Sequence, residues 1–294
     1  MGVSLSSLVP PGVGYPFARV IADAISSLRG SPMVKAVYSN QWVLHQGAVT
    51  RKQLSRLVRD TFRSSGRSLY EFWHYLSQPQ QVLDMVEFDQ SMIDVINRAN
   101  RRESGTILVS AHMANFDLAG RAIALRGLST QILSYPKPPG GYRWQNRIRE
   151  IPGMRVTPMS PTALREASET LREHGAVLTN VDRPLPASSL PEGGAKYRPR
   201  FFGRPAAMPV YHIRLALKHN LPITVLGAQR KPDGKYRVWA SEPIIMQRAS
   251  DLVEETVQNA EAVLNVLGEF IRRSPEQWGM YYPAWPETLD LPPL

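Results

Sequence analysis

The sequence predicts an α/β fold, in which a central mixed β-sheet is flanked by helices and preceded by an N-terminal layer made only of helices. Two observations lead to this prediction. Residues 1–103 carry apolar side chains at the spacing of amphipathic helices. From Thr106 onward, short β-branched apolar runs alternate with helical patterns, an order typical of sheets whose strands are connected by helices. We therefore divide the chain into residues 1–103, the helical layer, and residues 104–294, the α/β domain.

The helical layer contains three predicted helices. Residues 1–15 are rich in Ser, Pro and Gly and are expected to be irregular, so that the first helix begins at Pro16. The second helix is capped by Thr50, and the third spans residues 89–101. The apolar stripe of the first helix could enter a membrane interface, but most such stripes pack on their own protein, and we expect packing here. This stripe comprises Phe17, Val20, Ile21, Ala24, Ile25 and Leu28.

The α/β domain begins with a strand over residues 106–111. Ligands of α/β sheets gather beyond the carboxyl ends of the strands, so polar side chains at those ends are the first candidates for a site. Further strands are predicted at residues 130–135, 176–181, 223–229 and 236–240, and helices at residues 119–125, 162–174, 209–219 and 252–273.

Composition narrows the classes of function. The chain has 294 residues, a net charge of +10 and no cysteine. The charge favours a polyanionic partner or an anionic membrane surface, and the lack of cysteine excludes disulfides, thiolate metal sites and a cysteine nucleophile. Neither a secretory signal nor an apolar run of the roughly 20 residues that span a bilayer is visible. We therefore expect a peripheral protein if a membrane is involved.

His112 and Asp117 form the first candidate site. His112 leaves the strand over residues 106–111, and Asp117 follows after four intervening residues, in or near the first turn of the next helix. With His112 still in the loop, the chain can fold back and bring imidazole and carboxylate into hydrogen-bond contact. A histidine titrates near pKa ~6.5, so its neutral ring can accept a proton while a carboxylate on the other nitrogen fixes the tautomer. This pair could therefore act as a general base with its acidic partner.

The same two residues are also compatible with roles outside catalysis. They could form a surface contact, or Asp117 could simply favour the helix dipole. A serine nucleophile is a weaker candidate, because no G-x-S-x-G turn exists and Ser110 lies inside the strand. No metal is expected, since the other histidines lack ligand spacing of the H-E-x-x-H kind.

A second polar group ends the strand over residues 176–181. Asp182 and Arg183 follow this strand directly and place a carboxylate and a guanidinium at another strand exit, although Asp182 could instead cap a loop. Basic residues gather in the loops around these strand ends, where they would attract a phosphate-bearing substrate, an acidic carrier or anionic headgroups. They include Arg126, Arg147, Arg149, Arg198 and Arg200.

Taken in this order, the motifs resemble the bacterial lipid A biosynthesis acyltransferase family of the lysophospholipid acyltransferase superfamily, including its phosphatidylinositol mannoside acyltransferase relatives. The resemblance covers most of the chain. The histidine, four residues, acid motif is short, but its combination with a strand-ending acid and a Phe-Phe-Gly sequence is fairly specific. The segments that carry it are VGYPFARVIADAISSL, SNQWVLHQGAVTRKQLSRLVRDTFRSSGRSLYEF, LVSAHMANFDLAG, RIREIPGM, VLTNVDRP, FFGRPAAMP and SPEQWGMYYPAW.

The resemblance implies transfer of a fatty acyl group from acyl carrier protein or coenzyme A to a hydroxyl of a membrane glycolipid, without a cofactor or metal. His112 would be the general base and Asp117 its partner. Supporting or oxyanion roles would fall to Arg149, Asp182 and the backbone near Asn115. Substrate-binding positions would be Arg183, Arg200, Phe201, Phe202 and Gly203, although core packing accounts more simply for the two phenylalanines.

Three departures from the lipid A pattern favour a phosphoglycolipid acceptor. The first acid is Asp117 where Glu is usual, Arg183 replaces Gln after Asp182, and Pro283 and Ala284 stand where that branch carries basic residues. The resemblance also implies a peripheral enzyme on the cytoplasmic face of the membrane, with the helical layer facing the lipid. The alternatives are a hydrolase of the same fold and a non-catalytic nucleic-acid binder, for which we find no recognisable motif.

Overall fold

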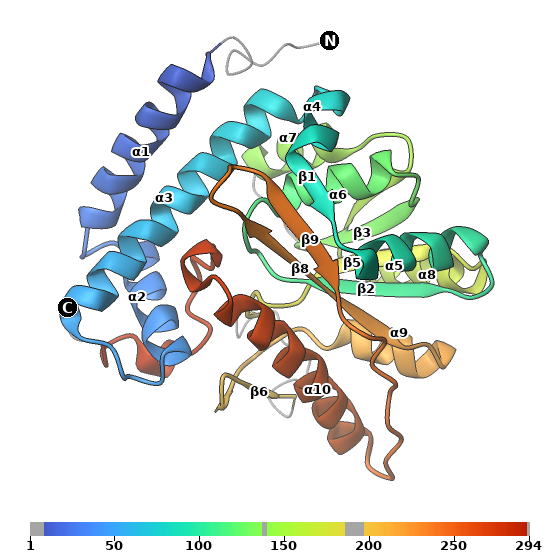
Figure 1. Ribbon diagram of the computed structural model, residues 1–294. Coiled ribbons are helices and arrows are strands. Elements are labelled where there is room, and N and C mark those ends of the chain that lie inside the picture. Colours follow the sequence, from blue (N-terminus) through green and yellow to red (C-terminus); the bar gives the residue numbers. More distant parts are fainter. Residues whose placement is uncertain (1–8, 137–139, 186–196, 293–294) are drawn as a thin grey trace.

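The computed structural model describes residues 9–136, 140–185 and 197–292, so residues 1–8 of the stretch expected to be irregular lie outside it. Its centre is a seven-stranded mixed sheet in the order β1-β9-β8-β2-β5-β3-β4. Helices flank this sheet, as the sequence predicts (Figure 1). The strands are β1 (Val86–Phe88), β2 (Thr106–Ser110), β3 (Thr130–Ser134), β4 (Met154–Pro158), β5 (Ala176–Asn180), β8 (Ile223–Arg230) and β9 (Tyr236–Ala240).

Strand direction decides where polar loop residues meet. Strands β2, β3, β4, β5 and β8 are mutually parallel, whereas β9 runs antiparallel to β8. The carboxyl ends of β2, β3 and β5 therefore open on one edge of the sheet. Residues that follow these three strands come together there although they are far apart in the sequence.

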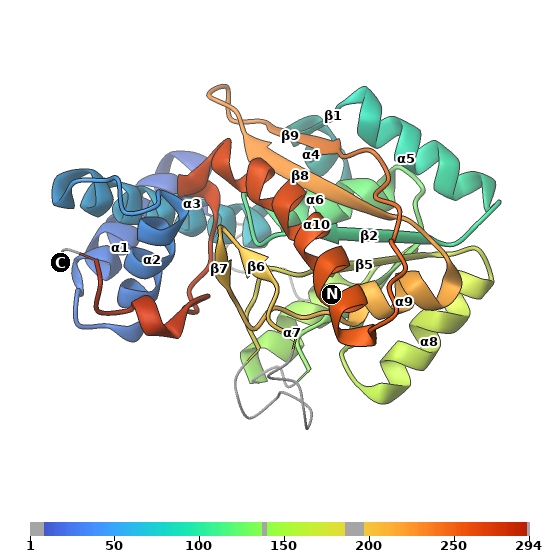
Figure 2. The ribbon, with the colours of Figure 1, turned by 90° about the horizontal axis from the view of Figure 1, so that it is seen from below.

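The two faces of the sheet pack on different helices. Ile107 and Val109 of β2 belong to the core under α8 (Pro161–Arg172), α9 (Tyr211–His219) and α10 (Leu252–Arg272). Leu108 belongs to the core on the opposite face, which is covered by α4 (Pro79–Met85), α5 (Gln90–Arg101) and α6 (Phe116–Leu125). This alternation follows from the period of two in a strand. Figure 2 shows α4 and α5 on one side of the sheet and α8 and α9 on the other.

The N-terminal helices form a separate layer beside the sheet. It consists of α1 (Pro11–Ser27), α2 (Pro32–Leu44) and α3 (Arg51–Tyr75). Thr50 caps α3 in a capping box with Gln53, which confirms the predicted start. Helix α1 begins at Pro11 rather than at Pro16, because Pro16 is tolerated within it. It packs along α3 on the side away from the sheet (Figure 1).

The prediction that residues 1–103 are entirely helical is wrong. Val86–Phe88 form β1, which pairs in parallel with β9 through Val86 and Tyr236. Helix α5 packs on the sheet as well, since Met92 and Ile96 belong to its core. A strand of three residues is too short to produce an alternation that can be recognised in the sequence.

The orientation of α1 is also opposite to the expectation. Its small residues face α3: Ala22 is buried, and a Cβ added to Gly66 of α3 would lie 3.0 Å from the Ala18 carbonyl oxygen. Close contact of the two helices along small residues leaves no room for the large apolar side chains between them. These side chains turn outward, and the exposed ones are Val13, Phe17, Val20, Ile21 and Leu28.

Most elements of the α/β domain match their predicted positions within a few residues. The sequence did not reveal α2, α4, the β4 strand or α7 (Gly140–Arg149), which packs on β4. It also did not reveal the hairpin of β6 (Arg200–Phe201) and β7 (Arg204–Pro205). In the described ranges, none of the helices is both long and apolar enough to cross a bilayer.

The C-terminal segment ties the helical layer to the sheet. The Asn40 side chain of α2 donates to the carbonyls of Met280 (3.0 Å) and Tyr282 (2.9 Å) and accepts from the amide of Ala284 (3.0 Å). Asn40, Met280 and Ala284 are buried, so loss of these hydrogen bonds would leave unpaired polar atoms. The same segment reaches the edge of the sheet where the polar loop residues meet, because the amide of Gly279 donates to the His112 carbonyl at 2.8 Å.

Candidate active site

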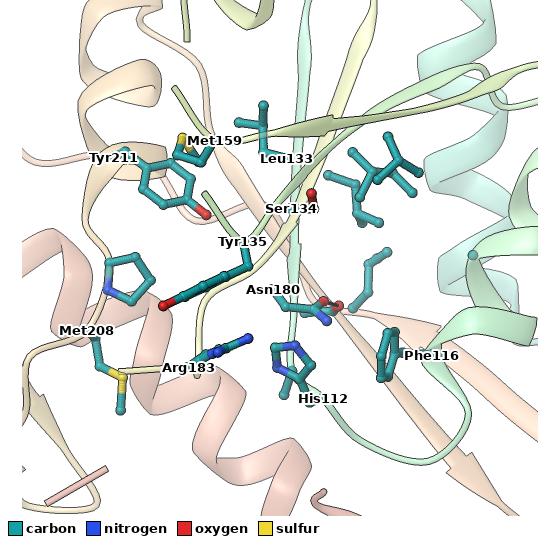
Figure 3. Close-up of a pocket in the computed structure, with 18 of the residues that line it drawn as sticks. His112, Phe116, Leu133, Ser134, Tyr135, Met159, Asn180, Arg183, Met208 and Tyr211 are labelled. Carbon is teal, nitrogen blue, oxygen red and sulfur yellow. Dashed lines mark hydrogen bonds between the residues drawn. The ribbon is translucent and has the colours of Figure 1, made fainter. Parts of the chain in front are cut away.

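A cavity of about 680 Å³ opens at the carboxyl edge of the sheet. Its lining comes mainly from β2, β3 and β5, from the residues that follow them, and from α6. Figure 3 shows His112, Tyr135, Asn180 and Arg183 gathered around it. The parallel strands thus create the common edge at which α/β folds bind ligands. Among the described residues, no group of three or more His, Asp or Glu side chains is placed to hold a metal ion.

His112 is held by Asp182. The imidazole Nδ1 lies 2.7 Å from Asp182 Oδ1, and the backbone N–H of His112 donates to Asp182 Oδ2 at 2.9 Å. Asp182 is fully buried, whereas the His112 side chain is 20% exposed and lines the cavity. Two contacts from one carboxylate fix both the loop and the ring, so the orientation of the imidazole is set by the neighbouring strand β5.

The charge of Asp182 determines the tautomer of His112. Burial opposes ionisation of this carboxyl group, but the interactions with His112 and Trp278 outweigh it and hold its pKa below the usual value. An ionised carboxylate can only accept hydrogen bonds, so the proton of the neutral imidazole sits on Nδ1. The Nε2 atom is then unprotonated and is the ring nitrogen left for the cavity, as a general base requires.

Trp278 provides a third hydrogen bond to the same carboxylate. Its indole Nε1 donates to Asp182 Oδ2 at 2.8 Å. The indole is fixed by Phe201, whose ring centroid lies 6.0 Å from that of Trp278 and 5.8 Å from that of Trp285. Trp278 was not predicted as a site residue, because a tryptophan far along the chain carries no signal of contact with Asp182.

Asp117 does not contact the imidazole, and the prediction that it is the partner of His112 is wrong. It lies in the first turn of α6, as predicted, but binds Arg149: Nε and Nη2 of Arg149 donate to its two carboxylate oxygens at 2.6 and 3.1 Å. The reason is the direction in which each acid projects from its own segment. Asp182 reaches His112 from the adjacent strand, while the first turn of α6 directs Asp117 toward α7.

Arg149 and Asp117 form a mostly buried ion pair in the wall of the cavity. Their side chains are 11% and 14% exposed, and Arg149 Nη1 also donates to Asn146 Oδ1 at 2.8 Å. The guanidinium lies 5.6 Å from the centroid of the Phe72 ring and 5.9 Å from that of Phe116. Its charge is thus already balanced, which makes the expected oxyanion role less suitable for Arg149 than for a free donor.

Asn115 has a structural position. Its Oδ1 accepts from the Leu118 amide at 3.2 Å, which caps α6, and its Nδ2 donates to Glu71 Oε2 at 3.2 Å. Glu71 is buried and also accepts hydrogen bonds from Tyr15 and Tyr236. Burial raises the pKa of Glu71, although these hydrogen bonds counteract part of the effect. This network joins α1, α3 and β9 to the start of α6.

Arg183 faces the cavity between two aromatic rings. Its Cζ lies 3.7 Å from the centroid of Tyr135 and 3.9 Å from that of Tyr282. Figure 3 shows the guanidinium next to the Tyr135 ring, on the side of His112. Within the described part of the chain no carboxylate pairs with Arg183, in contrast to Arg149. Arg183 thus lines the cavity, and its role in substrate binding stays a prediction.

The Phe-Phe-Gly segment lies outside the cavity wall, contrary to the expected substrate contact. Phe201 is 1% exposed and packs on the tryptophans of the core, in agreement with simple core packing. Phe202 and Gly203 form the tip of the β6–β7 hairpin. Arg200 is exposed and turns back to the Gly203 carbonyl, 3.2 Å away. Phe201 and Phe202 pack against the Trp278 ring.

Comparisons with known proteins identify the family of this chain. A family model described as bacterial lipid A biosynthesis acyltransferase matches residues 45–287. No curated protein matches the sequence. Among solved structures, the chain is similar to the 1-acyl-sn-glycerophosphate (LPA) acyltransferase PlsC from Thermotoga maritima, with 13% identity and a TM-score of 0.40 over 87% of this chain and 97% of that one.

The family match covers α3, the whole sheet and the cavity, including His112, Asp117, Arg149 and Asp182, and begins after α2. It confirms the resemblance that the motifs indicate. The chain belongs to the bacterial lipid A biosynthesis acyltransferase family and is an acyltransferase.

Proposed function

We propose that the protein is a membrane-surface O-acyltransferase. It transfers a fatty acyl chain from the thioester of acyl-CoA or acyl carrier protein to a hydroxyl of a phosphoglycolipid, with His112 as general base and Asp182 as its partner. The observation that carries the proposal is the imidazole at the cavity, oriented by a buried carboxylate that itself receives three hydrogen bonds. Such an arrangement serves proton transfer.

The chemistry follows from this geometry. His112 Nε2 takes the proton of the acceptor hydroxyl as its oxygen attacks the thioester carbonyl carbon. The new C–O bond forms, the C–S bond breaks, and the leaving sulfur takes the proton back from the imidazolium. Asp182 stabilises the imidazolium in between. A thiol of pKa ~8.5 is a good leaving group, so no further acid is needed.

The first turn of α6 can stabilise the oxyanion. The Leu118 amide already donates to the Asn115 side chain. The amides of Phe116 and Asp117 precede Leu118 in the same turn. First-turn amides have no acceptor within their own helix, and both residues line the cavity beside His112. Donors of this kind, fixed at a helix N-terminus, favour developing negative charge.

Arg183 suits a phosphate-bearing substrate. The two tyrosine rings lie against its guanidinium, and no described residue is found to accept a hydrogen bond from its N–H groups. Guanidinium groups bind phosphate through two parallel hydrogen bonds. This arrangement supports a phosphoglycolipid acceptor or a phosphate-containing donor.

The outer face of α1 supports action at a membrane. Phe17 and Val20 are 65% and 66% exposed. Arg19 and Arg29 are exposed on or next to the same helix. Apolar side chains combined with basic ones favour the interface of an anionic bilayer. We therefore propose peripheral attachment through α1 at the cytoplasmic face.

Vesicle co-sedimentation tests this attachment. The F17S/V20S double variant should lose most of its binding to vesicles of phosphatidylglycerol and phosphatidylcholine. The control is L252S, because Leu252 is 60% exposed on α10. Equal binding of the wild type, F17S/V20S and L252S would contradict attachment through α1.

The decisive experiment for the reaction is substitution of His112. We expect H112A to remain folded and to lose about 10²–10⁴-fold in acyl transfer, the usual contribution of a general base. The assay supplies palmitoyl-CoA or palmitoyl-acyl carrier protein with membrane lipid extract and measures products by mass spectrometry. The control is H174A, because His174 is exposed and does not line this cavity.

Two results would contradict the proposal. A folded H112A protein with full activity would remove the base from the mechanism. Accumulation of free fatty acid without acylated lipid would assign the chain to hydrolysis instead.

A further inference from the structure

The cavity extends from His112 into an apolar arm beneath α6. The floor of this arm is the middle of the sheet, where Ile132 of β3 and Leu178 of β5 are register partners. Both side chains keep partial exposure although they lie in central strands, because the arm reaches them. Apolar surface left open inside a domain is unfavourable unless an apolar ligand covers it. Further side chains along the arm are Val156, Leu226, Ala228 and Val238.

One stripe of α6 forms the roof. Phe116, Gly120 and Ile123 are separated by four and three residues, so they share a face of the helix, and all three line the cavity. The Phe116 ring centroid lies 5.2 Å from that of His112. Gly120 lies about 6 Å further along the helix axis. A chain whose reacting end is at His112 would therefore pass Gly120 as it enters the arm.

Neither backbone conformation nor close packing requires glycine at this position. Gly120 has no positive φ, and the nearest atom to an added Cβ is the flexible end of Met154, Cε, at 3.4 Å. Glycine inside a helix is less stable than alanine. The absence of a side chain at residue 120 therefore lowers the stability of the helix. It also leaves space in the arm that a larger residue would fill.

We propose that Gly120 sets how far an alkyl chain can enter this arm, and thereby the chain length that the enzyme selects. The inference rests on the proposed function, which brings the reacting end of the chain to His112. The same alkyl chemistry is present in the acyl donor and in the tails of the acceptor lipid. Larger side chains at residue 120 would fill the arm and exclude long chains.

Calorimetric binding tests the proposal without turnover. Wild type, G120A and G120L are titrated with octanoyl-, lauroyl- and palmitoyl-CoA, and with lauroyl and palmitoyl lysophosphatidylcholine. We expect G120L to bind the palmitoyl probe of one series about tenfold or more weakly, since several methylenes lose their burial, and G120A to show a smaller loss. Binding of the shortest probe in that series should change least, because it has the fewest methylenes beyond Gly120.

Two controls separate this role from a structural one. G120A should melt at or above the wild-type temperature, because alanine favours the helix. G12A is the matched control, since nothing lies within 4 Å of a Cβ added to Gly12 in α1, and its binding should equal that of the wild type.

The series that changes identifies the occupant: the acyl-CoA series indicates the donor chain, and the lysolipid series the acceptor tail. An unchanged chain-length profile in both G120 variants would overturn the proposal. Failure of the wild type to bind any acyl-CoA would instead contradict the proposed donor.

Discussion

Asp117 lines the cavity, and Asp182 is buried in contact with His112, so the two acids differ in both position and partners. Asp182 is completely buried and receives hydrogen bonds from the ring and amide of His112 and from Trp278. Asp117 is slightly exposed and forms a two-point ion pair with Arg149. One carboxylate is therefore placed to orient and stabilise an imidazolium, and the other is neutralised by a guanidinium. Proximity to His112 in the sequence does not make an acid its partner.

The largest effect should come from D182N. An asparagine can donate to Nδ1 and thereby place the imidazole proton on Nε2, which leaves His112 unable to accept the substrate proton. We expect kcat to fall by about 10²–10⁴-fold, measured by product formation at saturating substrate. The D117N variant is the matched control, because it makes the same chemical change at the same cavity. A folded D117N that loses more kcat than D182N would reverse the comparison.

W278F should have a smaller effect on the same carboxylate. Phenylalanine keeps much of the packing with Phe201 but removes the hydrogen bond to Asp182 Oδ2. Loss of a hydrogen bond to a charged group costs about 1.5–3 kcal/mol, so we expect kcat to fall by roughly 10- to 150-fold at most, with little change in KM. A change confined to KM would instead place Trp278 in substrate binding.

D117N should act mainly on stability. The substitution leaves the guanidinium of Arg149 only partly paired at an 11% exposed position. We expect the free energy of unfolding to fall by about 1–3 kcal/mol in urea denaturation, and kcat to change by less than about tenfold. An unchanged unfolding midpoint would show that this pair does not stabilise the wall of the cavity.

The smallest effect on kcat is expected for substitution of His212. This residue should change how stability depends on pH without changing catalysis. Its side chain is 1% exposed, and burial lowers its pKa to about 3. In the unfolded chain a histidine takes up a proton near pH ~6.5, so acid favours unfolding. Stability is thus fully present above that pH and should fall by roughly 1.4 kcal/mol per pH unit below it.

H212L tests this linkage. Urea denaturation between pH 5 and 7, a window of about two units around the ordinary histidine pKa, should show a shallower loss of stability than in the wild type, while kcat at neutral pH stays close to normal. An identical slope in both proteins would show that His212 is not the group responsible.

Much of the fold was predictable because the patterns are local. The strand before His112, the first turn of α6 and the Thr50 cap follow from periodicity and capping preferences within a few residues of each position. The position of Arg183 at the cavity was also predictable, since it directly follows a strand that runs parallel to β2. The strand β1 was missed because three residues carry too short a pattern.

The sequence by itself thus determined the α/β class, His112 at a strand end and the group of polar residues beside it. Only the tertiary structure decided which acid holds the imidazole, because that depends on the neighbouring strand and on an indole 96 residues beyond Asp182. It also decided that the large side chains of α1 face outward, since close packing on α3 requires the small ones. Hydrogen-bond partners and helix faces are set by packing between distant segments, which no local pattern encodes.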